Sequence, residues 1–450
     1  MEIIMFLRNK NWSDIPFAPR NWPFFYGWFL SVIGAFGIIA SSPGQTMGVG
    51  PYKEALENAL SLNEVQLSTA YMIGTILSSL LLPYAGRMLD RIGARRMVVL
   101  VSVSLAISLL YLAWTPLFTK WISIDSFLPI LFILSFGFLL IRFFGQGCLT
   151  MIPRVMIGKW FNHHRGLAIA ISGAIGSFGF YSSPAIINYL IQSMGWQNSY
   201  YLLALTVGIG MSLIGVLFFR DTPEECGLVM DGRDPQYFKR KRTGKIHETG
   251  KEFTRKEAAG MISFWAFALG LSTIALIYTA ITFHIDTIGA WKGFDRNEAF
   301  ALFVPLSFFS IAANLVSSWI SDIIRHKWQL LFMMLAQSVA LVSMIYLDHK
   351  IGLILFIVFQ GTAGGMFGAL AAVVFPRFFG RKHLGAISGL NMSVMVFASA
   401  VGPLLFSALR IITGSYTTVL YASLLMPVTV FILALRVENP QEGIKNKLQV

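Results

Sequence analysis

The chain has 450 residues, of which 55% are hydrophobic and only 13% are charged. This composition excludes an ordinary water-soluble domain and indicates that lipid surrounds most of the protein. The formal net charge of +13 points to basic loops and not to a nucleic-acid partner, because no polar stretch is long enough to fold into a binding face for one.

Twelve segments in succession are apolar enough to cross a bilayer as helices, which takes about 20 residues each. The fold class that we predict is an all-α membrane protein with twelve transmembrane helices. The predicted spans are 24–48, 65–85, 97–115, 128–152, 166–191, 198–219, 262–284, 298–320, 329–347, 351–374, 385–410 and 416–436. A polar stretch precedes the first span, so we expect no cleavable signal peptide.

The basic residues predict the orientation, because lysine and arginine concentrate in cytoplasmic loops. With the N-terminus inside, 28 of the 35 lysines and arginines fall in cytoplasmic segments. We therefore expect a multi-pass protein of the cytoplasmic (inner) membrane, with the tails at 1–23 and from about 437 onward both in the cytoplasm. The lipid bilayer is then a partner, and a monomer suffices.

One long polar segment, 220–260, divides the spans into six and six. Its composition is typical of a solvated loop, although its basic run "KRKRTGK" could also touch anionic lipid. The predicted domains are an N-terminal six-helix bundle at 1–219, a cytoplasmic linker at 220–260 and a C-terminal six-helix bundle at 261–450.

The two halves repeat each other. "KWFNHHRG" before the fifth span and "RFFGRKHLG" before the eleventh each lead to a glycine, Gly166 or Gly385, and a proline follows at the same spacing, Pro184 or Pro403. Matching features in matching order indicate a duplicated unit. The two bundles should therefore be pseudo-symmetric.

In the loop "GRMLDRIGARR" between spans two and three, each type of residue has a physical role that can be inferred from its chemistry. Gly86 permits close helix contact, Asp90 can bind the positive N-terminal end of a neighbouring helix, and the arginines can pair with carboxylates or lipid phosphates. In the second half, "SSWISDIIRHK" places Asp322 at the equivalent helix end.

This loop closely resembles the signature of the major facilitator superfamily, although its basic pair comes one place later than in the commonest form. The resemblance implies a latch that holds the two bundles together while the protein is open outward. The residues that it assigns to gating are Gly86, Asp90, Arg91, Gly93, Arg95, Arg96 and, by repetition, Asp322.

Within the superfamily, the chain resembles the monocarboxylate and oxalate/formate porter branch through "YGWFL" in span one, "GQG" in span four and "KWFNHHRGLA" before span five. Porters of that branch generally anchor carboxylates with basic residues in spans one, eight or eleven. The corresponding stretches here, "SSPGQTMG", "SIAANLVSSW" and "GLNMSVMVF", contain no lysine or arginine. The carboxylate-binding positions therefore do not carry over.

Arg142 stands inside the fourth span, roughly 15 Å along the helix from its predicted inner end at Ile152. A charge at that depth costs about 2.5 to 3.5 kcal/mol on insertion scales, so it should face a wet cavity or a partner. Ser135, Gln146 and Thr150 share its face of the helix. Two interpretations stay open: Arg142 anchors an anionic substrate, or it binds helix ends and carbonyl groups within the N-terminal bundle.

The resemblance implies that spans one, four, seven and ten line the transport path. The polar residues in these and neighbouring spans are candidates for substrate binding, although single amides such as Gln45, Asn314, Gln360 and Asn391 more often hydrogen-bond between helices. Besides Arg142, the candidates are Gln146, Gln45, Tyr278, Asn314, Gln360 and Asn391. His284 and Asp286, near the outer end of span seven, are a candidate proton site or simply a wet helix end.

The function that we predict is secondary active transport of a small organic solute, a carboxylate-type anion, by alternating access. The missing buried acid favours substrate exchange, or entry together with a coupling proton. One alternative is efflux of amphipathic drug-like compounds, and a second is a non-transporting membrane sensor. The sequence contains no nucleotide-binding loop, nucleophile elbow or metal-ligand spacing, so we expect no enzyme, no cofactor and no metal.

Overall fold

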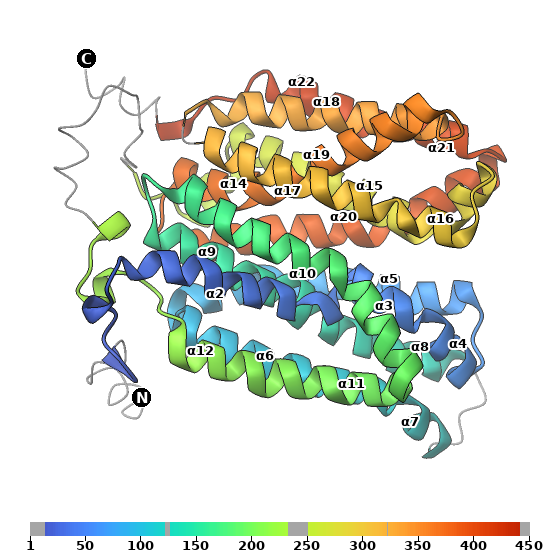
Figure 1. Cartoon of the computed structure of the whole chain (residues 1–450), viewed down its shortest axis with the longest axis horizontal. Helices are drawn as coiled ribbons and strands as arrows, with labels where there is room; N and C mark the ends of the chain where they lie inside the picture. Colours follow the sequence, from blue (N-terminus) through green and yellow to red (C-terminus); the bar gives the residue numbers. More distant parts are fainter. Residues whose placement is uncertain (1–13, 122–126, 233–250, 322, 442–450) are drawn as a thin grey trace.

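The computed structural model describes residues 14–121, 127–232, 251–321 and 323–441. Long helices dominate these residues, and Figure 1 shows them side by side in two groups, with the blue-to-green half of the chain below and the yellow-to-red half above. Eleven helices in the described parts are long and apolar enough to cross a membrane. The predicted all-α membrane fold is therefore confirmed.

The N-terminal bundle contains the first six spans. Its elements are η2 (Pro19–Asn21), α2 (Tyr26–Ala40), η3 (Ser42–Gly44), α3 (Thr46–Val49), η4 (Gly50–Tyr52), α4 (Lys53–Leu60), α5 (Glu64–Ile92), α6 (Ala94–Ala113), α7 (Thr115–Trp121), α8 (Phe127–Ile141), η5 (Arg142–Leu149), α9 (Thr150–Trp160), α10 (Arg165–Met194), α11 (Trp196–Leu205), η6 (Thr206–Met211) and α12 (Ser212–Phe218).

A linker and the second six spans follow. Their elements are η7 (Glu224–Cys226), η8 (Met230–Gly232), α14 (Arg255–Ala259), α15 (Ile262–Trp291), α16 (Arg296–Ala301), α17 (Phe303–Ile320), α18 (His326–Ile345), α19 (Lys350–Phe379), α20 (Leu384–Thr413), α21 (Tyr416–Ser423) and α22 (Leu425–Ala434).

The first span is broken, which explains why its longest regular piece, α2, is shorter than the other spans. Pro43 lies in the first turn of η3 and cannot continue the hydrogen bonds of α2. Gly44 then lies against span four, where a methyl group added to it would be 2.7 Å from the Cα atom of Gly145. The break therefore brings the backbone of span one directly against span four, where the Gly44 carbonyl accepts a hydrogen bond from Arg142.

Span four is longer than the sequence predicts, because it runs from Phe127 to Trp160 as α8, η5 and α9. The predicted end at residue 152 is wrong. Pro153 lies inside α9, and its ring packs on α2, where a methyl group added at Gly37 would lie 2.8 Å from it. The middle segment, η5, is a π-helix, a rare form that often marks functional positions in helices.

The two bundles meet along two equivalent helix pairs. The second span of each bundle packs on the fifth span of the other: α5 lies along α20, and α17 lies along α10. This exchange of partners is what a pseudo-twofold axis between duplicated halves produces. The central cavity described below lies between these two seams.

We call the end of the molecule where the described chain begins, at Asp14, and finishes, at Gln441, the termini end; it is on the left in Figure 1. Carboxylates of the linker bind equivalent loops here. Asp231 accepts the backbone N–H groups of Asn162, His163 and His164 before α10, at 2.9 to 3.0 Å. Glu252 accepts those of Arg381 and Lys382 before α20, at 2.6 and 2.8 Å. Each end of the linker is therefore hydrogen-bonded to one of the two bundles.

Candidate functional site

A cavity of about 210 Å³ lies between the two bundles. The N-terminal bundle contributes walls from spans one, four and five, and the C-terminal bundle contributes α15, α17, α19 and α20. Spans one, four, seven and ten, which the family resemblance placed on the transport path, all contribute to this lining. Four of the predicted substrate-binding residues line the cavity: Gln45, Gln146, Tyr278 and Asn314.

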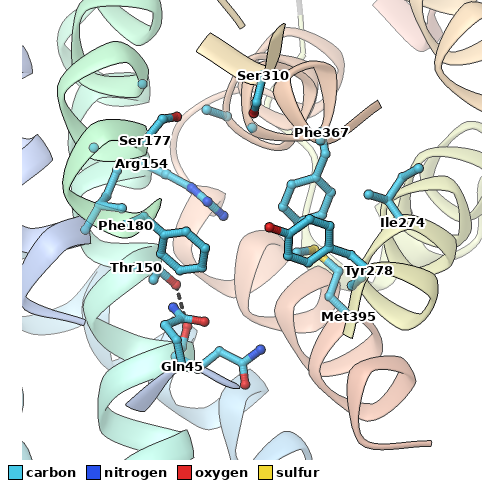
Figure 2. A pocket seen from close by; sticks show the side chains of 18 of the residues that line it. Gln45, Thr150, Arg154, Ser177, Phe180, Ile274, Tyr278, Ser310, Phe367 and Met395 are labelled. Atoms are coloured by element: carbon cyan, nitrogen blue, oxygen red, sulfur yellow. Dashed lines mark hydrogen bonds between the residues drawn. The ribbon is translucent and has the colours of Figure 1, made fainter. Parts of the chain in front are cut away.

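Arg154 on α9 carries the only charge among the described residues that line this cavity. Figure 2 shows its side chain extending from the N-terminal bundle into the space that Tyr278 and Phe367 border from the opposite side. Within the described parts of the chain, its guanidinium group has neither a hydrogen bond nor an ion pair. A partly exposed cation without a protein partner therefore faces the cavity.

Arg154 was not among the residues predicted to bind substrate, although the signal was present in the sequence. Gln146, Thr150 and Arg154 follow at intervals of four, so the polar stripe that contains Arg142 continues by one more turn. The expected end of the span at residue 152 placed Arg154 in a loop, where it counted as one of the cytoplasmic basic residues. Because α9 continues through Pro153, the residue belongs to the membrane-spanning helix.

Arg142 is fully buried and lies behind the cavity wall, outside its lining. Its Nη1 donates to the backbone oxygen of Gly44 at 3.1 Å and to the Thr46 hydroxyl at 3.4 Å, and its Nη2 donates to the Ser399 hydroxyl at 3.3 Å. The guanidinium carbon lies 5.1 Å from the ring centre of Tyr71, a cation–π contact. Arg142 thus binds carbonyl and hydroxyl groups of the protein itself.

Gln360 and Asn391 lie outside the cavity lining. The Gln360 Oε1 atom accepts the Nε2 of Gln337 on α18 at 3.1 Å, and Asn391 donates to the sulfur of Met395 on its own helix at 3.2 Å. Both side chains are buried within or beside the C-terminal bundle. We therefore no longer propose either as a substrate ligand.

Several buried oxygen atoms on residues that line the cavity have no hydrogen-bond partner in the described structure. They are Gln146 Oε1, Ser172 Oγ, Thr282 Oγ1 and Asn314 Oδ1. The Asn314 amide nitrogen donates to the Gly365 carbonyl at 3.1 Å, and its oxygen faces Gly173 on α10 of the other bundle. Uncompensated polar atoms in a protein interior are costly unless a ligand or water meets them.

The candidate proton site lies on the same helix as Tyr278 but away from the cavity. His284 is half-buried, its Nε2 lies 3.0 Å from the Pro403 carbonyl, and the residue does not line the cavity. The position of the Asp286 side chain is outside the described part of the structure. The pairing of these two residues stays a prediction.

The predicted latch contacts the opposite bundle at the termini end. The two carboxylate oxygens of Asp90 accept the N–H groups of Gly385 and Ala386, at 2.8 Å each. One turn earlier, a methyl group at Gly86 would overlap the Gly385 carbonyl and lie 2.9 Å from the Gly389 Cα atom. Only hydrogen at position 86 leaves room for this crossing of α5 and α20.

Arg95 of the same loop donates to carbonyl oxygens, those of Val216 at 2.8 Å and Ile15 at 2.7 Å. The other latch candidates at this end are Arg91 and Arg96, which are exposed, and Gly93, which ends α5 with a φ angle of +79°. Asp322 lies outside the described residues.

A second set of contacts closes the termini end. Arg381 of the C-terminal bundle donates to the carbonyl of Lys159 in the N-terminal bundle and lies 3.4 Å from the Glu224 carboxylate of the linker. Beside it, a methyl group at Gly158 would lie 3.0 Å from Leu384. These contacts join the two bundles on the termini side of the cavity floor, where Ile157 and Ala372 lie.

Comparisons with known proteins agree with this architecture. The sequence matches the family described as Major Facilitator Superfamily over residues 24–351 and 299–449. Among solved structures, the proton:xylose symporter XylE bound to 6-bromo-6-deoxy-D-glucose has a TM-score of 0.64 and 14% identity, covering 91% of this chain and 94% of that chain. A double-tryptophan variant of XylE has the same score and identity, covering 93% and 98%. At this identity the likeness shows the fold alone, and no curated protein sequence matches the chain.

Proposed function

Because the chain belongs to the major facilitator superfamily, a family of membrane transporters, we propose that it moves a small organic anion of the carboxylate type by alternating access. The observation that carries the proposal is Arg154, the one charge on the described lining of the cavity, which has no protein partner there. Guanidinium groups bind carboxylates through two parallel hydrogen bonds. An anion in the cavity would compensate this charge.

The cost of leaving Arg154 unpaired supports this assignment. A buried charge is unfavourable unless it is paired or hydrogen-bonded. Arg142 meets this need within the protein, because the Gly44 carbonyl, two hydroxyls and a tyrosine ring surround it. We propose that Arg142 stabilises the packing of spans one and four, and that Arg154 binds the substrate.

The same charge argues against the rival functions. A drug-efflux protein that accepts lipophilic cations needs a neutral or acidic cavity, whereas the described lining of this one carries a single positive charge. A non-transporting sensor on this scaffold gains nothing from an unpaired cation in its core. The resemblance to monocarboxylate porters implies the same class of substrate, a carboxylate. Here Arg154, and not a basic residue of spans one, eight or eleven, would bind it.

Alternating access requires that the contacts between the two bundles open alternately on the two sides of the cavity. We propose that both termini are cytoplasmic in the inner membrane, so that the closed termini end is the cytoplasmic gate. The substrate would contact both bundles, because residues of each line the cavity. No acidic residue is present on the described lining, which favours substrate exchange, or import with a proton that the carboxylate itself carries.

The deciding experiment is a thermal-shift screen of the purified full chain against small organic anions, neutral solutes such as xylose, and lipophilic cations. A ligand that binds the folded state raises its melting temperature by mass action. We expect carboxylates to stabilise wild type and Arg142→Gln, but not Arg154→Gln. We also expect Arg142→Gln to lower the melting temperature of the free protein more than Arg154→Gln does.

Uptake into proteoliposomes then tests transport itself. A radiolabelled carboxylate found in the screen should accumulate or exchange with wild type and not with Arg154→Gln. Stabilisation by xylose or by cations alone, or anion binding that survives Arg154→Gln, would refute the proposal.

A further inference from the structure

The cavity has two unlike walls, and their difference specifies the substrate more closely. Resting on the proposed function, we propose that the cargo is a monoanion with a flat apolar body, which spans the cavity with its carboxylate on the N-terminal bundle and its body against the C-terminal bundle.

The single charge sets the charge of the substrate. Arg154 is the only ionised group on the described lining, and no histidine accompanies it there. The second carboxylate of a dianion would lose its water without gaining a partner, and an unpaired buried charge is strongly unfavourable. Oxalate, succinate and similar dianions should therefore bind poorly.

The wall of the N-terminal bundle is polar where Arg154 emerges. Gln146, Thr150, Ser172 and Ser177 lie on the same face as Arg154, on α9 and the neighbouring span segments η5 and α10. This wall can surround a carboxylate with hydrogen-bond donors.

The opposite wall carries no charge on its described residues. It includes a surface of large apolar and aromatic side chains, Ile274 and Tyr278 of α15, Phe367 of α19 and Met392 and Met395 of α20, beside the smaller polar residues Thr279, Thr282, Ser310, Asn314 and Ser399. Methionine sulfur packs favourably against aromatic rings and adapts to their shape. A body without charge, and preferably with a ring, fits this wall.

Aromatic side chains border the cavity from both bundles. Figure 2 shows Phe180 on the side of Thr150, and Tyr278 with Phe367 across the space into which Arg154 extends. A planar ring placed between them can stack on either side, since aromatic pairs favour offset or edge-to-face arrangements. The cavity volume of about 210 Å³ leaves room for such a ring and a short acid side arm, because a cavity of about 150 Å³ already binds benzene.

The test compares four ligands on the purified full chain, by calorimetric titration or thermal shift. Phenylacetate is the expected substrate type, acetate removes the ring, phenylmalonate adds a second carboxylate, and benzyl alcohol removes the charge. We expect acetate, phenylmalonate and benzyl alcohol each to bind at least about tenfold more weakly than phenylacetate, as loss of one buried group of this size or charge predicts.

Two variants locate the two halves of the ligand. Arg154→Gln should abolish the advantage of phenylacetate over benzyl alcohol. Phe367→Leu should weaken phenylacetate about fivefold or more while leaving acetate unchanged, because only the ring meets that side chain. The comparison of ligands on wild type needs no variant, so it decides the matter even where Phe367→Leu fails to fold.

The outcomes separate this inference from the proposed function. If acetate or a dicarboxylate binds as tightly as phenylacetate, and Arg154→Gln abolishes that binding, the anion proposal stands and the apolar body is wrong. If benzyl alcohol equals phenylacetate, or if no anion depends on Arg154, both proposals are refuted.

Discussion

The carboxylate of Asp90 in one bundle accepts the backbone N–H groups of Gly385 and Ala386, at the start of α20 in the other bundle. A carboxylate at a helix N-terminus is stabilised both by the hydrogen bonds and by the helix dipole. Because the two partners belong to different bundles, this stabilisation exists only while the termini end is closed. We therefore predict that Asp90 contributes to the conformational equilibrium and not only to the fold.

Replacing Asp90 by asparagine should open the termini end. Asparagine offers one acceptor and no charge, so the closed state should lose about 1 to 3 kcal/mol. The measurement is labelling of a cysteine introduced at Ile157, on the cavity floor, by a soluble maleimide. We expect labelling at least about fivefold faster in Asp90→Asn than in the parent, from that change in free energy.

A matched control for Asp90 exists in the linker. Asp231 also binds backbone N–H groups before a helix, those of Asn162, His163 and His164, but without joining the two bundles. Asp231→Asn should lower the melting temperature and leave the labelling rate at position 157 unchanged. Equal acceleration by both substitutions would show that Asp90 is merely a helix cap.

Replacing Gly86 by alanine should also destabilise the closed state. The added methyl group would overlap the Gly385 carbonyl, a backbone atom that cannot rotate away. Overpacking of this kind costs about 1 to 3 kcal/mol. Gly210→Ala is the control, because a methyl group there meets no atom within 4 Å of it. We expect faster labelling at position 157 and reduced transport only for Gly86→Ala, and unaltered labelling would contradict the tight crossing of α5 and α20.

The buried amide pair of Gln337 and Gln360 should behave as one unit. Their single hydrogen bond leaves Gln337 Oε1 and Gln360 Nε2 unpartnered in the described structure. Each single leucine substitution strands the remaining amide and should cost about 1 to 3 kcal/mol, whereas the double substitution should be nearly neutral. Denaturation of the four proteins in the cycle gives the coupling energy, and additive costs would disprove the pairing. Substrate affinity should not change in any of them.

Cys226 should resist alkylation in the folded protein. Burial raises the pKa of its thiol to about 12, so at pH 7.5 the reactive thiolate is on the order of ten-thousandfold scarcer than the thiol. The expected labelling with maleimide is negligible until the protein is denatured, and the rate should rise with pH. Mass spectrometry of native and denatured samples checks this, and fast native labelling would show that the 224–226 turn is open.

The sequence was sufficient for the architecture because span length, hydropathy and basic loops follow directly from the properties of the bilayer. It was less informative about the site. Proline ordinarily ends a helix, so Pro153 hid the continuation of α9. Its ring packs against the glycines of α2, Gly34 and Gly37, a tertiary contact that the sequence does not show. For the same reason Arg154 was assigned to a loop and was not predicted as a site residue.

The polar residues inside spans show the same limit. Gln146 and Gln360 look alike in the sequence, since each is an amide among apolar residues. Whether such a side chain faces a cavity or a neighbouring helix depends on what lies opposite, and Gln337 on α18 happens to lie opposite Gln360. Periodicity identifies the face of a helix but not the partner of that face.

Arg142 binds the two bundles unequally. Its Nη1 is held by two groups of span one, Gly44 and Thr46, whereas its Nη2 reaches the other bundle through Ser399 alone, at 3.3 Å. If the two bundles rotate relative to each other, the guanidinium group should keep its contacts with span one, and only its distance to Ser399 should increase. A pair of spectroscopic labels placed near Arg142 and Ser399 should therefore report the angle between the two bundles.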